Sequence, residues 1–229
     1  MKLYLATGNE NKKREMKQIL ETPDSSITIV IPKDEGIAFD PEETGTTFHE
    51  NSLIKAKALW NIVHCPVIAD DSGICVDALG GAPGVYSSRY AGPQFMKGKA
   101  SGEKIPQQDQ NRMLIEQLND AVSKGIDIEK GKAAGLYKNG PRSAHYTCSM
   151  VFYFGYDKFV IAEETMEGTI LERVEDQRGT GGFGYDPLFF LPSYGKTAAE
   201  LTADEKNKIS HRGKATRIIT GILKNVEKM

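Results

Sequence analysis

The segment from Pro66 to Gly92 constrains the fold of this chain more than any other stretch. It opens with a short apolar run, residues 66–69, which predicts a buried strand bounded by turn-forming residues. Two adjacent carboxylates, Asp70 and Asp71, follow this strand directly, and a glycine-rich stretch at residues 80–84 comes soon after. Open α/β sheets bind their ligands beyond the carboxyl ends of the strands. The order of these residues therefore predicts an α/β fold with a ligand site at that edge of the sheet.

The paired acids suggest a cation as well as a ligand. Two adjacent carboxylates repel each other unless a proton or a cation neutralises them, and a hard cation such as Mg²⁺, carried in on a phosphate, meets this need. An ordinary polar turn is the alternative, because Asp, Ser and Gly are common turn formers. A loop with Glu42 and Glu43 offers further oxygen ligands if it folds over the same crevice, although its composition alone favours a solvated loop.

Charge and length exclude several classes of protein. The chain has 229 residues, enough for a sizeable core, and its 29 Lys and Arg against 31 Asp and Glu give a formal net charge of −2. No global positive field is therefore available for nucleic acid or an anionic membrane, so a polyanionic ligand needs a local positive site. The 3 cysteines include no CxxC pair, and no stretch is apolar enough for a signal peptide or a membrane span. We expect a cytoplasmic protein with reduced thiols.

Apolar periodicity predicts one α/β unit with two lobes rather than separate domains. Strands are expected at residues 3–6, 27–31, 66–69, 147–154, 158–163 and near 168–174. Helices are expected around Met16, from a capping box of Thr47 and Glu50, at 109–122, and from a second capping box of Thr202 and Glu205. Residues 93–106 and 124–145 are rich in Gly, Lys, Ser and Pro, which predicts exposed loops.

The stretch Thr7-Gly8-Asn9-Glu10-Asn11-Lys12 joins the first strand to the first helix. Free backbone N–H groups, the positive end of the helix dipole and Lys12 together suit a phosphate. The second glycine and the Ser or Thr of a Walker A loop are missing. An ordinary turn between strand and helix is the simpler alternative.

Residues 179–187 combine four glycines with two aromatic residues and an acid. Glycine lets the backbone approach a flat ligand closely, which Phe183 would stack upon while Asp186 accepts a ring N–H. Alternatively, Phe183 and Tyr185 are buried anchors of a turn.

The last helical stretch contains Lys206, Ser210, His211 and Arg212. Lys206 and Ser210 share a helix face, but His211 lies on another. If all of them meet one ligand, the helix must bend or restart near Gly213. A structural histidine and a solvated face of Lys and Arg are the alternatives.

Four separated segments together resemble the inosine/xanthosine triphosphate pyrophosphatase family, enzymes that remove deaminated purine nucleotides. They are TGNENK, TFHENSLIKAKAL, ADDSGICVDALGGAPGVYSSRYAG, and GTGGFGYDPLFF followed by EKNKISHRGKA, in order from about residue 3 to residue 215. The resemblance implies an elongated α/β molecule with a mixed sheet, flanking helices and two lobes around a central cleft, usually a homodimer. It implies one catalytic domain over residues 1–229 and Mg²⁺-dependent hydrolysis of ITP, dITP or XTP to the monophosphate and pyrophosphate. Residues 93–106 and 124–145 fall outside it and look longer than the connections usual in the family.

The same resemblance implies roles for individual residues. Asp71 would accept a proton and, with Glu42, hold Mg²⁺. The nucleotide would be bound by Thr7, Gly8, Asn9, Glu10, Asn11, Lys12, Ser72, Phe183, Gly184, Tyr185, Asp186, Lys206, His211 and Arg212. Asp70 stays open between a water-mediated metal contact and a turn cap.

Two other functions stay open at this point. A nucleotide sensor would keep the pocket without chemistry, although it would have no need of a base such as Asp71. A phosphatase working through an aspartyl-phosphate would use the paired acids and release inorganic phosphate rather than pyrophosphate. A nucleic-acid binder is disfavoured because the chain has no basic face.

Overall fold

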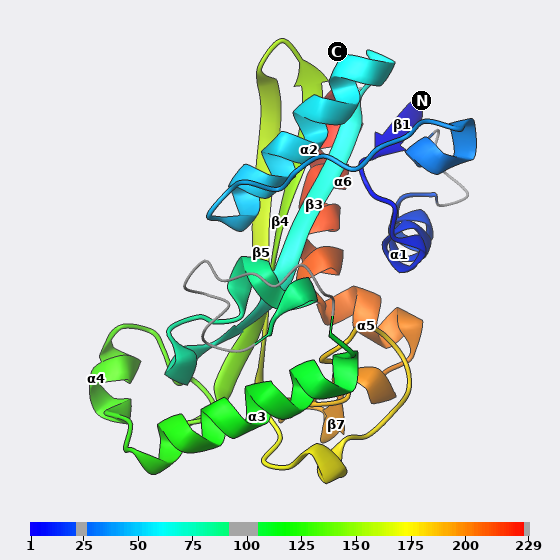
Figure 1. Cartoon of the computed structure of the whole chain (residues 1–229). Coiled ribbons are helices and arrows are strands. Elements are labelled where there is room, and N and C mark those ends of the chain that lie inside the picture. Colours follow the sequence, from blue (N-terminus) through cyan, green and yellow to red (C-terminus); the bar gives the residue numbers. More distant parts are fainter. Residues whose placement is uncertain (22–26, 92–104, 227–229) are drawn as a thin grey trace. The chain divides into compact units, whose positions relative to one another are not determined.

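A mixed seven-stranded sheet organises residues 1–21, 27–91 and 105–226, which are the residues that the computed structural model describes. The strand order is β2-β1-β3-β4-β5-β6-β7, and β3, β4 and β5 run side by side in Figure 1. β1 (Lys2–Leu5) pairs in parallel with β2 (Thr28–Val30) and β3 (Val67–Val76). β5 (Lys158–Ile170) pairs antiparallel with β6 (Phe189–Leu191), as β6 does with β7 (Lys196–Thr197), and β4 spans Ser143–Gly155. The predicted α/β class with a mixed sheet and flanking helices is confirmed.

The helices follow the periodicity of the sequence. They are α1 (Glu10–Leu20), α2 (Phe48–Val63), α3 (Gln107–Ser123), α4 (Ile128–Ala133), α5 (Ala203–Ile209) and α6 (His211–Val226). The capping box that the sequence predicts for α2 is present, with Thr47 and Glu50 each bonding the other's backbone. Among the helices of the described ranges, none combines the length and apolar character of a membrane span. The three cysteines, all within those ranges, form no disulfide, as predicted.

The chain divides into two compact units. The first unit comprises Met1–Ser72, Thr147–Thr165 and Glu205–Met229, and the second unit comprises Gly73–Tyr146 and Met166–Asp204.

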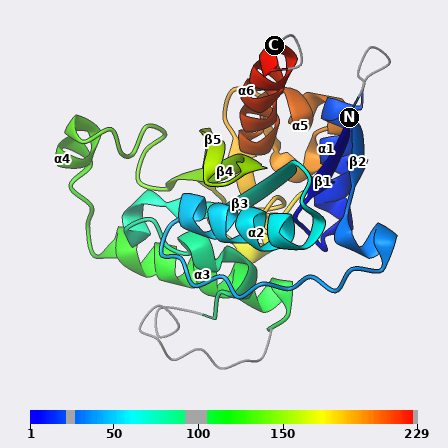
Figure 2. The ribbon, with the colours of Figure 1, turned by 90° about the horizontal axis from the view of Figure 1, so that it is seen from above.

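The first unit buries both faces of its part of the sheet. Because side chains alternate along a strand, Leu3 and Leu5 lie in one apolar cluster and Tyr4 in the other. The cluster with Leu3 includes α1 and α6 residues, and the cluster with Tyr4 includes α2 residues. Seen from above, α2 covers one face of β1 and β3, while α1 and α6 cover the other (Figure 2). The two faces of β3 therefore meet different helices.

The second unit is built around α3. This helix buries Leu114 and Leu118, and it also buries two amides, Gln110 and Asn111. Near the beginning of β4, the Tyr146 ring contacts Phe189 edge-on, with centroids 4.8 Å apart.

The strand predicted at residues 66–69 is too short. β3 continues to Val76, so Asp70 and Asp71 lie within a strand rather than at its carboxyl end. The predicted end of the strand at residue 69 and the turn interpretation of Asp70–Gly73 are therefore wrong. Turn-forming residues continue the strand here because tertiary ion pairs, described below, neutralise the buried acids.

Two loop predictions also change. Residues 124–145 contain α4 and the start of β4, so this segment is not a continuous loop. The other predicted loop, 93–106, lies almost wholly outside the described residues. The strand expected near 168–174 is wrong as a separate element, because 168–170 end β5 and Val174–Asp176 form a 3₁₀ helix.

Candidate functional site

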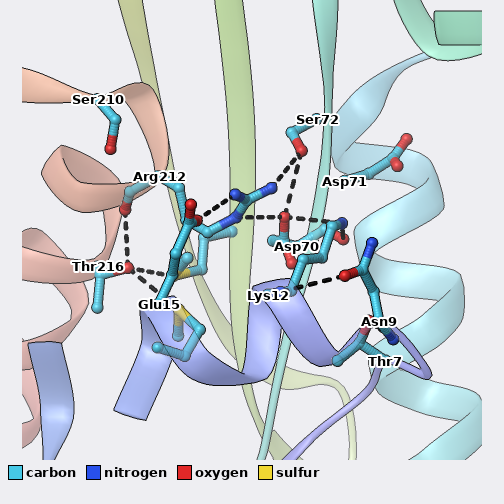
Figure 3. A network of polar contacts seen from close by, with 12 residues as sticks. Thr7, Asn9, Lys12, Glu15, Asp70, Asp71, Ser72, Ser210, Arg212 and Thr216 are labelled. Atoms are coloured by element: carbon cyan, nitrogen blue, oxygen red, sulfur yellow. Dashed lines mark hydrogen bonds and ion pairs between the residues drawn. The ribbon is translucent and has the colours of Figure 1, made fainter. Parts of the chain in front are cut away.

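Asp70 and Asp71 face opposite sides of β3. Asp70 meets side chains from α1 and α6 (Figure 3), whereas Asp71 meets the α2 side chains Asn51 and Lys55. Neighbouring residues of a strand point to opposite faces, which gives each acid its own set of partners. Each acid therefore has cationic partners of its own within the chain.

Asp70 is neutralised by the chain's own cations. Its Oδ2 lies 2.9 Å from Lys12 Nζ and 3.2 Å from Arg212 Nε, and its side chain is 1% exposed. Burial opposes ionisation, but Lys12 and Arg212 outweigh it and hold the pKa of Asp70 far below its ordinary value. Its Oδ1 is buried without a hydrogen-bond partner among the described residues. Asp70 is thus the centre of a buried ion-pair cluster, and the turn-cap alternative is wrong.

Arg212 is fixed by contacts from all three nitrogens of its guanidinium group. Besides Asp70, it donates from Nη1 to Glu15 Oε2 at 2.5 Å and from Nη2 to Ser72 Oγ at 2.8 Å. Burial disfavours its charge, but Asp70 and Glu15 outweigh this and raise the pKa of Arg212 above its ordinary value. Glu15 also lies 4.0 Å from Lys206 Nζ. One α1 carboxylate therefore holds two of the cations that the sequence assigns to the nucleotide.

The last helical stretch restarts as expected, slightly earlier than Gly213. α5 ends at Ile209 and α6 begins at His211. A Cβ on Gly213 would lie 2.0 Å from the Asn207 carbonyl oxygen, so this close approach requires glycine. The break buries Lys206, His211 and Arg212, so the alternative of a solvated cationic face is wrong. Burial, together with the charges of Arg212 and Lys206, holds the pKa of His211 well below its ordinary value.

Asp71 is held from both sides by α2. Asn51 Nδ2 donates to its Oδ2 and Lys55 Nζ to its Oδ1, each at 3.2 Å. Lys55 also lies 3.0 Å from Glu43 Oε1. Burial alone would lower the pKa of Lys55, but the neighbouring charges of Asp71, Asp70 and Glu43 raise it. The carboxylate of Asp71 therefore has a fixed orientation beside a fixed positive charge.

The acidic loop that contains Glu42 and Glu43 packs against Asn51 and Lys55, the two partners of Asp71. The Gly45 N–H donates to Asn51 Oδ1 at 2.8 Å, and a Cβ on Gly45 would lie 2.6 Å from that oxygen. Only glycine fits this contact, which brings Glu43 to Lys55. Of the two alternatives for this loop, Glu43 follows the folded one through its pair with Lys55, while the side chain of Glu42 is exposed, as in a solvated loop.

The donor set fits a cation that arrives with its ligand. Among residues 1–21, 27–91 and 105–226, no three His, Cys, Asp or Glu side chains gather as a ready-made metal site. Mg²⁺ commonly keeps several waters and uses one or two carboxylates plus substrate phosphates. The carboxylates of Asp71 and Glu42 match such a set and do not form a closed cage.

The loop from Thr7 to Lys12 is more occupied than expected. Asn9 Oδ1 accepts the N–H groups of Asn11 and Lys12, at 2.9 and 3.2 Å, and so caps α1. Thr7 Oγ1 accepts the N–H of Asn9 at 3.1 Å. The expectation that these N–H groups are free is therefore wrong for Asn9, Asn11 and Lys12. Gly8, Asn9, Glu10 and Asn11 are all exposed.

The loop of residues 183–186 forms a braced turn in the second unit. Asp186 Oδ2 accepts the Phe183 N–H at 2.5 Å, and the Asp186 N–H donates to the Phe183 carbonyl at 2.9 Å. Tyr185 is buried and donates its hydroxyl to the Ser87 carbonyl at 3.0 Å, so its ring is the core anchor that the alternative interpretation expected. Burial raises the pKa of Tyr185. Phe183 is half-buried.

The predicted site residues fall into two groups. The first unit contains Thr7, Gly8, Asn9, Glu10, Asn11, Lys12, Glu42, Asp71, Ser72, Lys206, His211 and Arg212, and the second contains Phe183, Gly184, Tyr185 and Asp186. Sequence reasoning gave no role to Glu15, Asn51 or Lys55. Asn51 and Lys55 were detectable from their shared helix face one turn apart behind the capping box. Glu15 carried no such signal, because Arg212 is 197 residues away.

Comparison with known proteins identifies relatives over nearly the whole chain. A model described as the Ham1 family matches residues 3–221. A dITP/XTP pyrophosphatase of Treponema denticola is 47% identical over 224 residues, which cover 98% of this chain and 99% of that protein. The dITP/XTP pyrophosphatase of Escherichia coli K12 is 39% identical over 226 residues, with 98% of each chain covered. The structure of a HAM1 protein from Coxiella burnetii aligns with a TM-score of 0.77 at 33% identity, covering 98% of this chain and 99% of that one.

Proposed function

The chain belongs to the Ham1 family, and we propose that it hydrolyses deaminated purine nucleoside triphosphates (ITP, dITP and XTP) to the monophosphate and pyrophosphate. The names of its relatives support the substrate class. The observation that carries the chemistry is the carboxylate of Asp71, which is held between Asn51 and Lys55 while Asp70 is neutralised separately. Removal of such nucleotides from the pool is the corresponding cellular role, and we propose that the protein acts in the cytoplasm as a homodimer.

Asp71 acts as the base in this proposal. Asn51 and Lys55 donate one hydrogen bond to each of its oxygens, which fixes the carboxylate and leaves lone pairs for a water. A positioned base typically contributes a factor of about 10²–10⁴ to the rate. Lys55 pairs with Glu43 as well as with Asp71, so Lys55 and the carboxylate of Asp71 do not form an exclusive ion pair.

Asp71 and Glu42 are the residues that would hold Mg²⁺. When bound, the ion would neutralise charge on the triphosphate and polarise the phosphoryl group. Glu42 is exposed and belongs to the loop that Gly45 ties to Asn51, so the chain presents this carboxylate without desolvating it in advance.

The remaining charges serve the two ends of the nucleotide. Thr7 to Lys12 and the N-terminus of α1 are assigned to the phosphates, with Lys12 as the cation. Arg212 is assigned to the base, because a guanidinium donor pairs with a 6-oxo group and leaves the 6-amino group of adenine facing a donor. A mismatch of this kind discriminates by roughly 10⁴. Glu15, Asp70 and Ser72 hold that guanidinium in a fixed plane before any ligand arrives.

Product analysis separates this proposal from its alternatives. The purified protein is incubated with Mg²⁺ and ITP, XTP, ATP or GTP, and pyrophosphate and inorganic phosphate are assayed separately. Pyrophosphate from ITP and XTP supports the proposal. Inorganic phosphate alone indicates an aspartyl-phosphate phosphatase, and tight ITP binding without turnover indicates a sensor. Exclusion of GTP at its 2-amino group is part of the proposal, and equal kcat/KM values for GTP and ITP would contradict it.

A further inference from the structure

The turn of residues 183–186 is held by a helix that has no assigned role. Asn111 of α3 donates from Nδ2 to the Gly184 carbonyl oxygen at 3.3 Å. Asn111 is 2% exposed, so this amide is buried against the turn rather than solvated. Its own Oδ1 accepts from Gln107 Nε2 at 3.0 Å, one helical turn earlier.

Gln107 fills the space that a side chain on Gly184 would need. A Cβ built on Gly184 would lie 2.1 Å from Gln107 Oε1. The exposed Gln107 therefore lies directly over Gly184, while the buried Asn111 holds its carbonyl. Gln107 and Asn111, one helical turn apart on α3, therefore both contact the chain at Gly184.

The peptide between Gly184 and Tyr185, which Asn111 and Gln107 contact, has a second polar group. In a trans peptide the carbonyl and the N–H point in opposite directions, so fixing the Gly184 oxygen fixes the direction of the Tyr185 N–H. The Tyr185 ring is anchored to Ser87 and Asp186 closes the turn on Phe183. These two contacts fix the ends of the turn, and the Asn111 amide fixes the peptide between them.

We propose that Asn111 is a positioning residue for nucleobase selection, acting through the Gly184–Tyr185 peptide, and that Gln107 sets the orientation of its amide. This inference rests on the proposed function and on the family resemblance, which assigns residues 183–186 to the nucleotide. A base pocket discriminates through the direction of its polar groups, so a rotated peptide weakens the preference for a 6-oxo purine over a 6-amino purine. The reacting phosphates are served by Asp71 and Lys12, so KM changes more than kcat.

The first test exchanges the donor for an acceptor. In Asn111→Asp a carboxylate oxygen faces the Gly184 carbonyl, which removes the hydrogen bond and repels the peptide. We expect KM for ITP to rise about tenfold and the ratio of kcat/KM for ITP to that for ATP to fall by a similar factor. Asn119→Asp is the matched control, because Asn119 on the same helix donates its amide to the Glu172 carbonyl at 3.2 Å. That variant is expected to keep the unmodified KM and discrimination.

A second pair of variants keeps the test valid if a buried acid impairs folding. Gln107 is exposed, and in Gln107→Glu its acceptor-only carboxylate competes for the Asn111 Nδ2 donor and turns it away from Gly184. Discrimination is expected to fall in this variant and to fall less in Gln107→Met, which removes the donor to Asn111 Oδ1 but offers no competing acceptor. Melting temperatures of both should match the unmodified protein.

The outcomes distinguish this inference from the proposed function. If the unmodified protein releases no pyrophosphate from ITP, the proposed function and the inference both fail. If it discriminates ITP from ATP and both Asn111→Asp and Gln107→Glu discriminate equally well, only the inference is overturned. A loss in Gln107→Glu that exceeds the loss in Gln107→Met, with Asn119→Asp unchanged, supports it.

Discussion

Asp70 and Asp71 are adjacent in the sequence but belong to two separate ion-pair clusters on opposite faces of β3. Asp70 pairs with Lys12 and Arg212, and Asp71 pairs with Lys55. Asp70 holds the two cations in place, and Asp71 keeps an orientation suited to binding a water. This division predicts that the two acids have different effects when each is replaced by its amide.

Replacement of Asp71 should affect chemistry. We expect Asp71→Asn to lower kcat by about 10² or more, because a general base is lost while the amide still fits beside Asn51. Steady-state kinetics with ITP measure the effect, and circular dichroism checks the fold. Asp120→Asn, at an exposed acid of α3, is the control. Near-normal turnover in Asp71→Asn would refute the role of this residue.

Replacement of Asp70 should affect stability. Asp70→Asn leaves Arg212 and Lys12 buried without their shared counter-charge, and breaking a buried pair costs about 3–5 kcal/mol. Urea unfolding of the variant and the unmodified protein measures the difference. A loss below about 1 kcal/mol, as is usual for a surface pair, would show that the cluster is not buried in solution.

The pH dependence of stability should include a contribution from His211. Its native pKa lies well below the ordinary value because of burial and the nearby Arg212 and Lys206. The unfolded chain therefore takes up a proton below about pH 6.5 that the native protein does not, and stability falls as pH decreases through this range. The slope from this one group is at most about 1.4 kcal/mol per pH unit.

Urea unfolding between about pH 7 and pH 5 tests that slope. The slope should flatten in His211→Gln and stay unchanged in His49→Gln, since His49 is exposed. An identical slope in His211→Gln and the unmodified protein would mean that His211 takes up a proton in the native state.

Short sequence patterns predicted the structural features that depend on residues close together in the sequence. The capping box of Thr47 and Glu50 located the start of α2, and the periodicity of the sequence placed most helices and strands. The motif around Asp71 identified the group that the structure holds between two donors. The family resemblance supplied the roles that periodicity does not contain.

Long-range electrostatics accounts for most of what the sequence did not predict. Asp70 resembled a turn residue because its partners Lys12 and Arg212 lie 58 and 142 residues away. Their charges permit β3 to continue through a stretch of turn formers. The burial of Lys206, His211 and Arg212 likewise depends on the break between α5 and α6, which a helical pattern of charges does not reveal.

The half-buried Phe183 should bind the base through its ring. We expect Phe183→Ala to weaken nucleotide binding by about 1–3 kcal/mol, the usual contribution of base stacking on an aromatic side chain. Calorimetric titration with inosine monophosphate measures the Kd directly. Phe159→Ala, at a partly exposed ring of the first unit, is the matched control. An unchanged Kd in Phe183→Ala would assign Phe183 to packing alone.

The most direct measurement is the identity of the product formed from ITP in the presence of Mg²⁺. The account predicts pyrophosphate and the matching monophosphate in equal amounts, inosine monophosphate from ITP and xanthosine monophosphate from XTP, with little turnover of ATP. Chelation of the ion should abolish turnover, because the negative carboxylates of Asp71 and Glu42 repel the triphosphate when no cation lies between them. Release of inorganic phosphate without pyrophosphate would contradict the account, since the bond broken would then not be the one next to the α-phosphorus.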